Sequence, residues 1–204
     1  MIPNEVNIVL KDIWPMLLLF IIVIVTIRVM DIILNKKKFV LYKDLFMLMF
    51  ILYMFLLFEL VTSTDFESYS NNFIPFKEIM RYKFMSKMFI YNVLGNILIF
   101  VPFGYFISRY VKPKKILPII VDALITSVTV ETVQLKIGRS FDIDDIILNI
   151  AGAIIGYFVY IAFAAIYKHL PKILQKDFIY DVISLIILTM FILYAANILD
   201  LRWF

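Results

Sequence analysis

The sequence contains no cysteine and only one histidine among its 204 residues. The absence of cysteine excludes disulfide bonds, thiol nucleophiles and cysteine-based metal sites. The single histidine, His169, lies beside Lys168 in a basic stretch, so no serine–histidine–aspartate catalytic set can be built. The net charge is only +4. It comes mostly from lysines between apolar segments, and we therefore expect no nucleic-acid partner.

Apolar residues dominate the rest of the chain. They make up 63% of it, whereas soluble domains contain about 45–50%. Six apolar segments are long enough to cross a bilayer core of about 30 Å. We expect an all-α, polytopic membrane helical bundle of about six transmembrane helices, forming a single integral membrane domain over residues 1–204. The segments span residues 13–34, 44–62, 89–108, 116–137, 145–167 and 179–199.

Basic residues between these segments predict the orientation, because short cytoplasmic loops are enriched in lysine and arginine. The first, third and fifth connections are basic and nearly free of acid. Their basic residues are Lys36, Lys37, Lys38, Lys43, Arg109, Lys112, Lys114, Lys115, Lys168, Lys172 and Lys176. We expect a multi-pass membrane protein with both termini extracytoplasmic and with the second and fourth connections facing outward.

The second connection carries a stripe of apolar residues spaced three and four apart, a pattern typical of a helix. Lys77 and Arg81 lie on the polar side of this stripe. The pattern predicts a short interfacial helix at the outer face, and the alternative is a simple lead-in to the third membrane segment. The members of the stripe are Phe73, Phe76, Met80, Phe84 and Met88.

Polar residues concentrate in the stretch ETVQLKIGRSFDIDDIILNIAGAIIG, from Glu131 to Gly156. Glu131 and Gln134 share a helix face because they are three residues apart. On the next helix, Asp145 lies on one face with Gly152 and Gly156, and this glycine spacing is typical of close helix packing. We expect one polar cluster that also includes a residue of the third segment. Its predicted members are Asn96, Glu131, Gln134, Arg139, Asp142, Asp145 and Asn149.

Three interpretations of this cluster are open. Buried charges and amides are costly unless they are paired, which favours a ligand-binding site. Arg139 would then bind a phosphate or carboxylate, and Glu131 is a candidate catalytic acid/base. The second interpretation is a structural lock of hydrogen bonds between helices. The third is a hard cation held by Glu131, Asp142, Asp144 and Asp145. Such an acidic loop is more often a solvated helix cap, so we expect no metal ion and no other cofactor.

Three blocks occur in chain order: NFIPF from Asn72, GNILIFVPFG from Gly95, and the polar stretch from Glu131 to Gly156. Together they resemble the VanZ-like family, named for a teicoplanin-resistance protein of Gram-positive bacteria. The blocks match that family's Asn-x-x-Pro-Phe element, its Gly-Asn-x-x-x-Phe-x-Pro-x-Gly helix and its most distinctive polar segment. The resemblance covers a family-like core of about residues 70–160.

The resemblance implies a plasma-membrane protein that contributes to glycopeptide tolerance, toward teicoplanin in particular. We expect it to bind membrane lipid, a lipid-linked wall precursor or a lipoglycopeptide at the outer leaflet of the cell envelope. The alternative is a membrane enzyme or carrier acting on a phosphate- or carboxylate-bearing lipid, with Glu131 as acid/base and Arg139 as anion clamp. A third hypothesis is an assembly partner for wall-synthesis proteins. The sequence leaves open whether the protein is an enzyme.

The orientation can be tested with single cysteines, because the chain has none of its own. The variants Ser140→Cys and Lys114→Cys should react from opposite sides of the membrane. In intact cells, an impermeant maleimide should label Ser140→Cys and should leave Lys114→Cys unlabelled until the cells are lysed. Equal labelling of the two variants in intact cells would contradict this topology.

Overall fold

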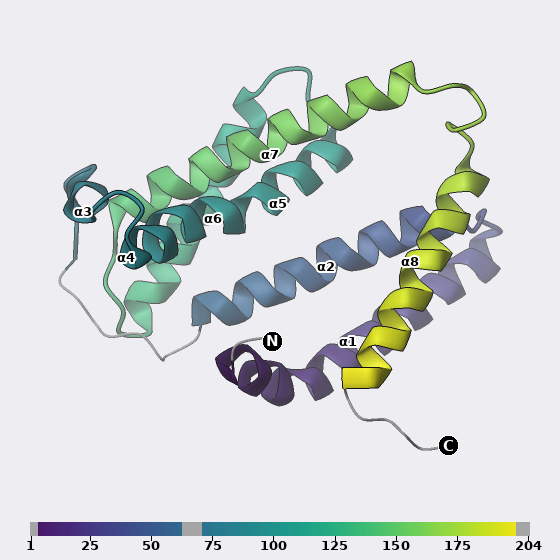
Figure 1. Ribbon diagram of the computed structural model, residues 1–204, viewed down its shortest axis with the longest axis horizontal. Coiled ribbons are helices and arrows are strands. Elements are labelled where there is room, and N and C mark those ends of the chain that lie inside the picture. Colours follow the sequence, from purple (N-terminus) through teal and green to yellow (C-terminus); the bar gives the residue numbers. More distant parts are fainter. Residues whose placement is uncertain (1–3, 63–70, 199–204) are drawn as a thin grey trace. The chain divides into compact units, whose positions relative to one another are not determined.

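Helices make up nearly all of the regular structure. The computed structural model describes the backbone of residues 4–62 and 71–198 and the side chains of residues 16, 18–62 and 71–193. Within these ranges, one isolated backbone bridge joins two extended segments. In chain order (Figure 1) the elements are α1 (Asn4–Asn35), α2 (Leu41–Thr62), α3 (Lys77–Arg81), α4 (Lys87–Phe89), the π-helix η1 (Ile90–Leu94), α5 (Gly95–Val111), α6 (Leu117–Lys136), α7 (Ile143–His169) and α8 (Asp177–Ile198).

The structure confirms the prediction of an all-α helical bundle. Within the described residues, five helical spans are long and apolar enough to cross a membrane: Leu18–Asn35, Leu41–Thr62, Lys87–Val111, Leu117–Lys136 and Ile143–His169. The sixth predicted segment, residues 179–199, forms α8. The described side chains of α8 end at Leu193, and residue 199 lies outside the described residues.

The boundaries of α6 and α7 follow from local chemistry. Pro118 lies in the first turn of α6. The N–H groups there have no acceptor within the helix, so proline, which lacks an N–H group, costs no hydrogen bond. Asp142 precedes α7, and its side chain accepts a hydrogen bond from the backbone N–H of Asp144, as an N-cap residue does. Asp142 thus ends the short polar connection between α6 and α7, residues 137–142, which carries Arg139 and Asp142 of the predicted cluster.

The connection before α4 is more broken than its apolar stripe predicts. The short predicted helix is present as α3, but it ends at Arg81 after five residues. Phe76 before it has a φ of 65°, and Met85 after it has a φ of 59°. Both values are left-handed, a conformation through which a right-handed helix does not continue. The apolar side chains of the stripe are nevertheless all exposed, as suits contact with lipid or another amphiphile.

The chain divides into two compact units. We call Tyr53–Leu170 the central unit, and Met1–Leu52 together with Pro171–Phe204 the terminal unit. In the terminal unit, α2 is joined to α8 by an ion pair of 3.0 Å between Lys43 and Asp177. The prediction of one membrane domain over the whole chain stays a prediction.

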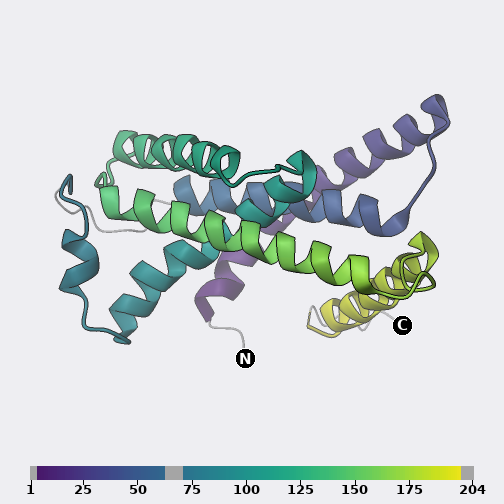
Figure 2. The ribbon, with the colours of Figure 1, turned by 90° about the horizontal axis from the view of Figure 1, so that it is seen from above.

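The core of the central unit lies where α5, α6 and α7 meet. α7 contacts both other helices extensively and lies between them (Figure 2). Residues near the end of α2 complete this core, and α7 is the element that positions the neighbouring polar groups. The buried core residues are Leu57, Val61, Phe100, Phe103, Ile119, Ala123, Ala153 and Tyr157.

Two glycines of α7 allow its close packing against α5. A Cβ atom at Gly152 would overlap the backbone carbonyl of Ile97, and one at Gly156 would overlap the carbonyl of Val101. Backbone atoms cannot rotate away as a flexible side chain can, so a residue without Cβ is required at both positions. The predicted glycine packing face is therefore confirmed.

Gly152→Ala should destabilise the protein, although it adds only one methyl group. We expect a loss of about 1–3 kcal/mol, as for overpacking in a protein interior, measured as lower thermal stability and folded yield in detergent. Gly95→Ala is the matched control, because a Cβ atom there meets only the carbonyl oxygen of Ile90, at 3.8 Å. Equal melting temperatures for the two variants would contradict the close contact.

Candidate functional site

The polar cluster includes a direct contact between α5 and α7. Asn96, in the first turn of α5, donates a hydrogen bond from Nδ2 to Oδ1 of Asp145, in the first turn of α7. The close packing of the two helices brings these side chains together. The structure thus places a residue of the third predicted segment beside the polar stretch, and a ligand-binding role for the pair stays a prediction.

The C-terminal part of α6 contributes Glu131 and Gln134. The side chain of Glu131 is 1% exposed, and its Oε2 accepts the backbone N–H of Asp142 at 2.8 Å. The orientation of the Gln134 amide is assigned from its neighbours, because exchanging its nitrogen and oxygen satisfies both of them. Its nitrogen donates to Oε1 of Glu131 at 2.9 Å, and its oxygen accepts from Nη1 of Arg139 at 3.1 Å. A chain of hydrogen bonds therefore connects the buried Glu131 with Arg139.

The turn after α6 brings Arg139 back toward the helix end. Gly138 has a φ of 90°, a left-handed conformation that glycine adopts without a steric penalty. The backbone N–H of Arg139 then donates to the carbonyl of Gln134 at 2.9 Å. Because Arg139 is half-buried, its guanidinium lies at the edge of the cluster.

The loop before α7 pairs with the NFIPF block. The N–H of Asn72 donates to the carbonyl of Phe141 at 2.8 Å, and the carbonyl of Asn72 accepts from the N–H of Ile143 at 3.0 Å. The side chain of Asn72 also donates to Oδ1 of Asp142 at 2.8 Å. Asn72 is 3% exposed. It therefore belongs to the cluster, which its motif alone did not predict.

Asp144 anchors α3, a role that the sequence did not indicate. Its carboxylate accepts the backbone N–H groups of Phe76 at 2.5 Å, Glu78 at 2.8 Å and Ile79 at 3.1 Å. These groups lie at the start of α3, where unpaired N–H groups favour a negative charge. Asp144 is 1% exposed, so it is a buried anchor rather than a solvated cap.

Asn149 lies one helical turn after Asp145 on α7 and joins α7 to α6. Its Nδ2 donates to Oγ of Ser127 on α6 at 2.9 Å, and both side chains are buried. Ser127 is one helical turn before Glu131 and was not among the predicted cluster residues. A lone serine in an apolar helix gives little signal, because its partner lies on another element.

Burial acts on both charged groups of the α6–α7 connection. It lowers the pKa of Arg139, while the carboxylates of Glu131 and Asp145 act to raise that pKa. Burial raises the pKa of Asp142, whereas hydrogen bonds from neighbouring amides lower it. Each group therefore has neighbours that favour its charged form against the cost of leaving water.

The structure does not support a cation site in this acidic loop. Among the residues that it describes, no group of three or more histidine, aspartate or glutamate side chains is placed to hold a metal ion. Asp144 provides one reason, because both of its oxygens accept backbone N–H groups. The interpretation of the four acids as cation ligands is therefore not retained.

Asp144→Asn should loosen α3, because asparagine supplies one acceptor oxygen where Asp144 uses two. We expect a loss of about 1–3 kcal/mol for the buried amides left unpaired, and faster amide hydrogen exchange at Glu78 and Ile79. Hydrogen-exchange mass spectrometry of peptides covering α3 measures this effect. Glu78→Gln is the matched control, since that side chain pairs with the exposed Arg81 and such surface pairs contribute little. Equal exchange in the two variants would refute the anchor.

A sequence model of the VanZ/LLP1 family matches residues 39–165. This range covers more than half of the chain and begins upstream of the core expected from the three motifs. It includes α2, the NFIPF block and the polar connection between α6 and α7. No curated protein and no solved structure matches the chain. The extent of the family match is sufficient to conclude that this chain belongs to the VanZ/LLP1 family and is a VanZ-like membrane protein.

Proposed function

We propose that this protein contributes to glycopeptide tolerance, including tolerance of teicoplanin, at the plasma membrane of a Gram-positive bacterium. In this proposal it binds the polar head of a lipid, a lipid-linked wall precursor or a lipoglycopeptide at the outer leaflet. The observation that carries the proposal is the position of Arg139, half-buried at the edge of a buried polar cluster. Family membership supports the link to glycopeptides.

The surroundings of Arg139 suit an anionic head group. A planar guanidinium offers parallel donors to a phosphate or carboxylate. The nearby acids are stabilised by donors other than this arginine: Glu131 by the backbone N–H of Asp142, and Asp144 by the amides of α3. These hydrogen bonds reduce the repulsion that the acids would exert on a bound anion.

An apolar surface adjoins this arginine. Phe141, two residues after Arg139, stacks against Phe73 with ring centroids 5.3 Å apart. Phe73 is exposed, as are Phe76 and Met80. An acyl chain can lie on these side chains while its head group binds the guanidinium, which is how an amphiphile divides its contacts between apolar and polar groups.

The lysine distribution supports an outward-facing position for the site. The connections at residues 36–43, 109–115 and 168–176 are basic, and basic short loops favour the cytoplasmic side. The connection between α6 and α7 is then extracytoplasmic, as are both termini. Lipid-linked wall precursors and lipoglycopeptides meet at this leaflet.

Glu131 supports a second candidate function, a membrane enzyme or carrier acting on a phosphate- or carboxylate-bearing lipid. Its carboxylate is buried and is linked through Gln134 to Arg139, an arrangement that suits acid/base chemistry beside an anion clamp. Both oxygens of Glu131 already accept hydrogen bonds, which favours the binding function. If purified protein turned over an anionic lipid and Glu131→Gln abolished this turnover, the enzyme or carrier function would be favoured over binding alone.

Arg139→Lys should lose most of the drug tolerance while the protein stays folded and inserted. Lysine keeps the charge but cannot offer two parallel donors. We therefore expect the affinity for an anionic head group to fall roughly tenfold, as for the loss of one charge-assisted hydrogen bond. Tolerance of cells expressing the variant and thermal stability of the purified protein measure the two effects separately.

Lys136→Ala is the control, because it removes an exposed positive charge from the same end of α6 and should leave tolerance and stability unchanged. If tolerance falls only as far as the amount of folded protein falls, the cluster is a structural lock, in which an unpaired buried charge costs about 3–5 kcal/mol. If the wild-type protein does not change the glycopeptide tolerance of its host, the tolerance proposal is wrong. Binding of a head group would then be measured directly on the purified protein.

A further inference from the structure

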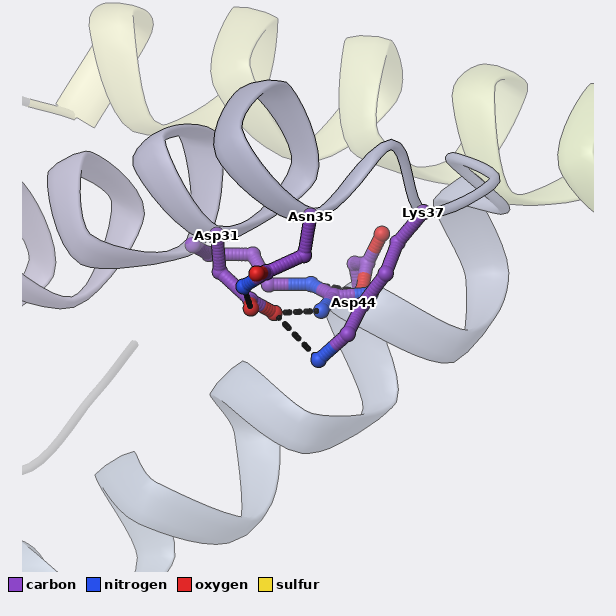
Figure 3. Close-up of polar contacts among 5 residues, drawn as sticks. Asp31, Asn35, Lys37 and Asp44 are labelled. Atoms are coloured by element: carbon purple, nitrogen blue, oxygen red, sulfur yellow. Dashed lines mark hydrogen bonds and ion pairs between the residues drawn. The ribbon is translucent and has the colours of Figure 1, made fainter.

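A second polar network lies in the terminal unit, at the end of α1 and the start of α2. Arg28 donates from Nε to Oδ1 of Asp44 at 2.7 Å and from Nη1 to Oδ2 of Asp31 at 2.8 Å. Figure 3 shows Asn35 and Lys37 also converging on Asp31, at 2.6 and 2.9 Å. Asp31 therefore receives donors from three residues, whereas Arg28 is the donor that the structure gives to the side chain of Asp44.

One carboxylate oxygen of Asp44 has no donor among the described residues. Its Oδ2 is buried, and none of the residues that the structure describes forms a hydrogen bond with it. Buried polar atoms are almost always paired, and leaving a charged one unpaired is especially unfavourable. This atom therefore points to a partner that the described part of the chain does not supply.

The neighbouring charges favour a cation as that partner. Asp31 and Asp44 share one guanidinium, that of Arg28. Lys37 pairs with Asp31, and its side chain is 53% exposed, so it does not compensate Asp44. With Lys37, the network has two cations for two carboxylates, but Lys37 pairs with Asp31 and leaves the second oxygen of Asp44 without a donor among the described residues. A bound ammonium group would supply that donor together with a positive charge.

An apolar groove leads away from this network. Its volume is about 530 Å³, and it is lined by the three charged residues Arg28, Asp31 and Asp44 and otherwise by apolar side chains. Ile24 and Ile51 of the lining are each seven residues from an aspartate of the network, or about 10 Å at 1.5 Å per residue. The groove therefore has a polar end near the α1–α2 connection and an apolar end deeper in the two spans.

We propose that this groove binds an aminophospholipid, with its primary ammonium on Asp44 and an acyl chain along the apolar wall. A primary ammonium supplies both the positive charge and the N–H donors that the carboxylate lacks. Asp44 is itself one of the residues that line the groove, and its side chain is 15% exposed. The bound lipid would stabilise the pairing of α1 with α2.

The test compares two lipids that differ in the head-group nitrogen. Purified full-length protein is reconstituted with equal amounts of phosphatidylethanolamine and phosphatidylcholine of identical acyl chains, and retained lipids are counted by native mass spectrometry. Phosphatidylcholine has the same phosphate and formal charge but no N–H donor. We expect wild-type protein to retain phosphatidylethanolamine about tenfold more than phosphatidylcholine, the factor for one hydrogen bond to a charged group.

Asp44→Asn should bring this ratio close to one, because the amide removes the charge that holds the ammonium. Asp177→Asn is the matched control, the same change at an aspartate of the same unit that is about half exposed, and it should leave the ratio unchanged. Since Asp44→Asn also removes the ion pair with Arg28, Leu48→Trp provides a second test. It fills the groove from its apolar wall and should reduce the retained phosphatidylethanolamine severalfold.

Equal retention of the two lipids by wild-type protein would overturn the proposal, as would a preference that survives Asp44→Asn. If Asp177→Asn also abolished the preference for phosphatidylethanolamine over phosphatidylcholine, the net charge of the terminal unit would be what attracts the lipid. Asp44 would then not be the binding site. Unchanged retention by folded Leu48→Trp would place the lipid outside the groove and would also overturn the proposal.

Discussion

The backbone of α7 lies against the backbone of α5 at Gly152 and Gly156, and the rest of the central unit depends on this contact. Any side chain at these positions would force the helices apart. Because Asp145 lies on the same face of α7, the contact also brings its carboxylate to Asn96. A steric constraint in the apolar core thereby sets the position of polar groups at the helix ends.

The polar cluster satisfies backbone groups that apolar side chains cannot. Glu131 accepts the N–H of Asp142, and Asp144 accepts three N–H groups at the start of α3. In apolar surroundings such groups need partners within the protein. The amide of Gln134 bonds to the other oxygen of Glu131 and to Arg139, which links Arg139 to the same cluster. A structural role for the cluster and a binding role at its edge are therefore compatible.

The two polar networks, one in each unit, are satisfied to different degrees. Around Glu131 and Asp144, the donors come from the protein itself, so these carboxylates need no ligand to complete their hydrogen bonds. At Asp44, one oxygen lacks a donor within the described residues, so a bound cation would add directly to stability through mass action. The two proposed binding sites therefore differ, because only a ligand at Asp44 would supply a missing donor.

The sequence by itself determined the membrane class, the helices, the glycine face and the polar stretch, because composition and helical period are local properties. Only the tertiary structure decided which donor meets which acceptor. Asn72 and Asp142 are 70 residues apart, and Phe76 and Asp144 are 68 apart; no rule of spacing connects residues over such separations. The period of the stripe in residues 73–88 describes neighbours along one helix, whereas the start of α3 is held by hydrogen bonds from its backbone to a carboxylate on α7.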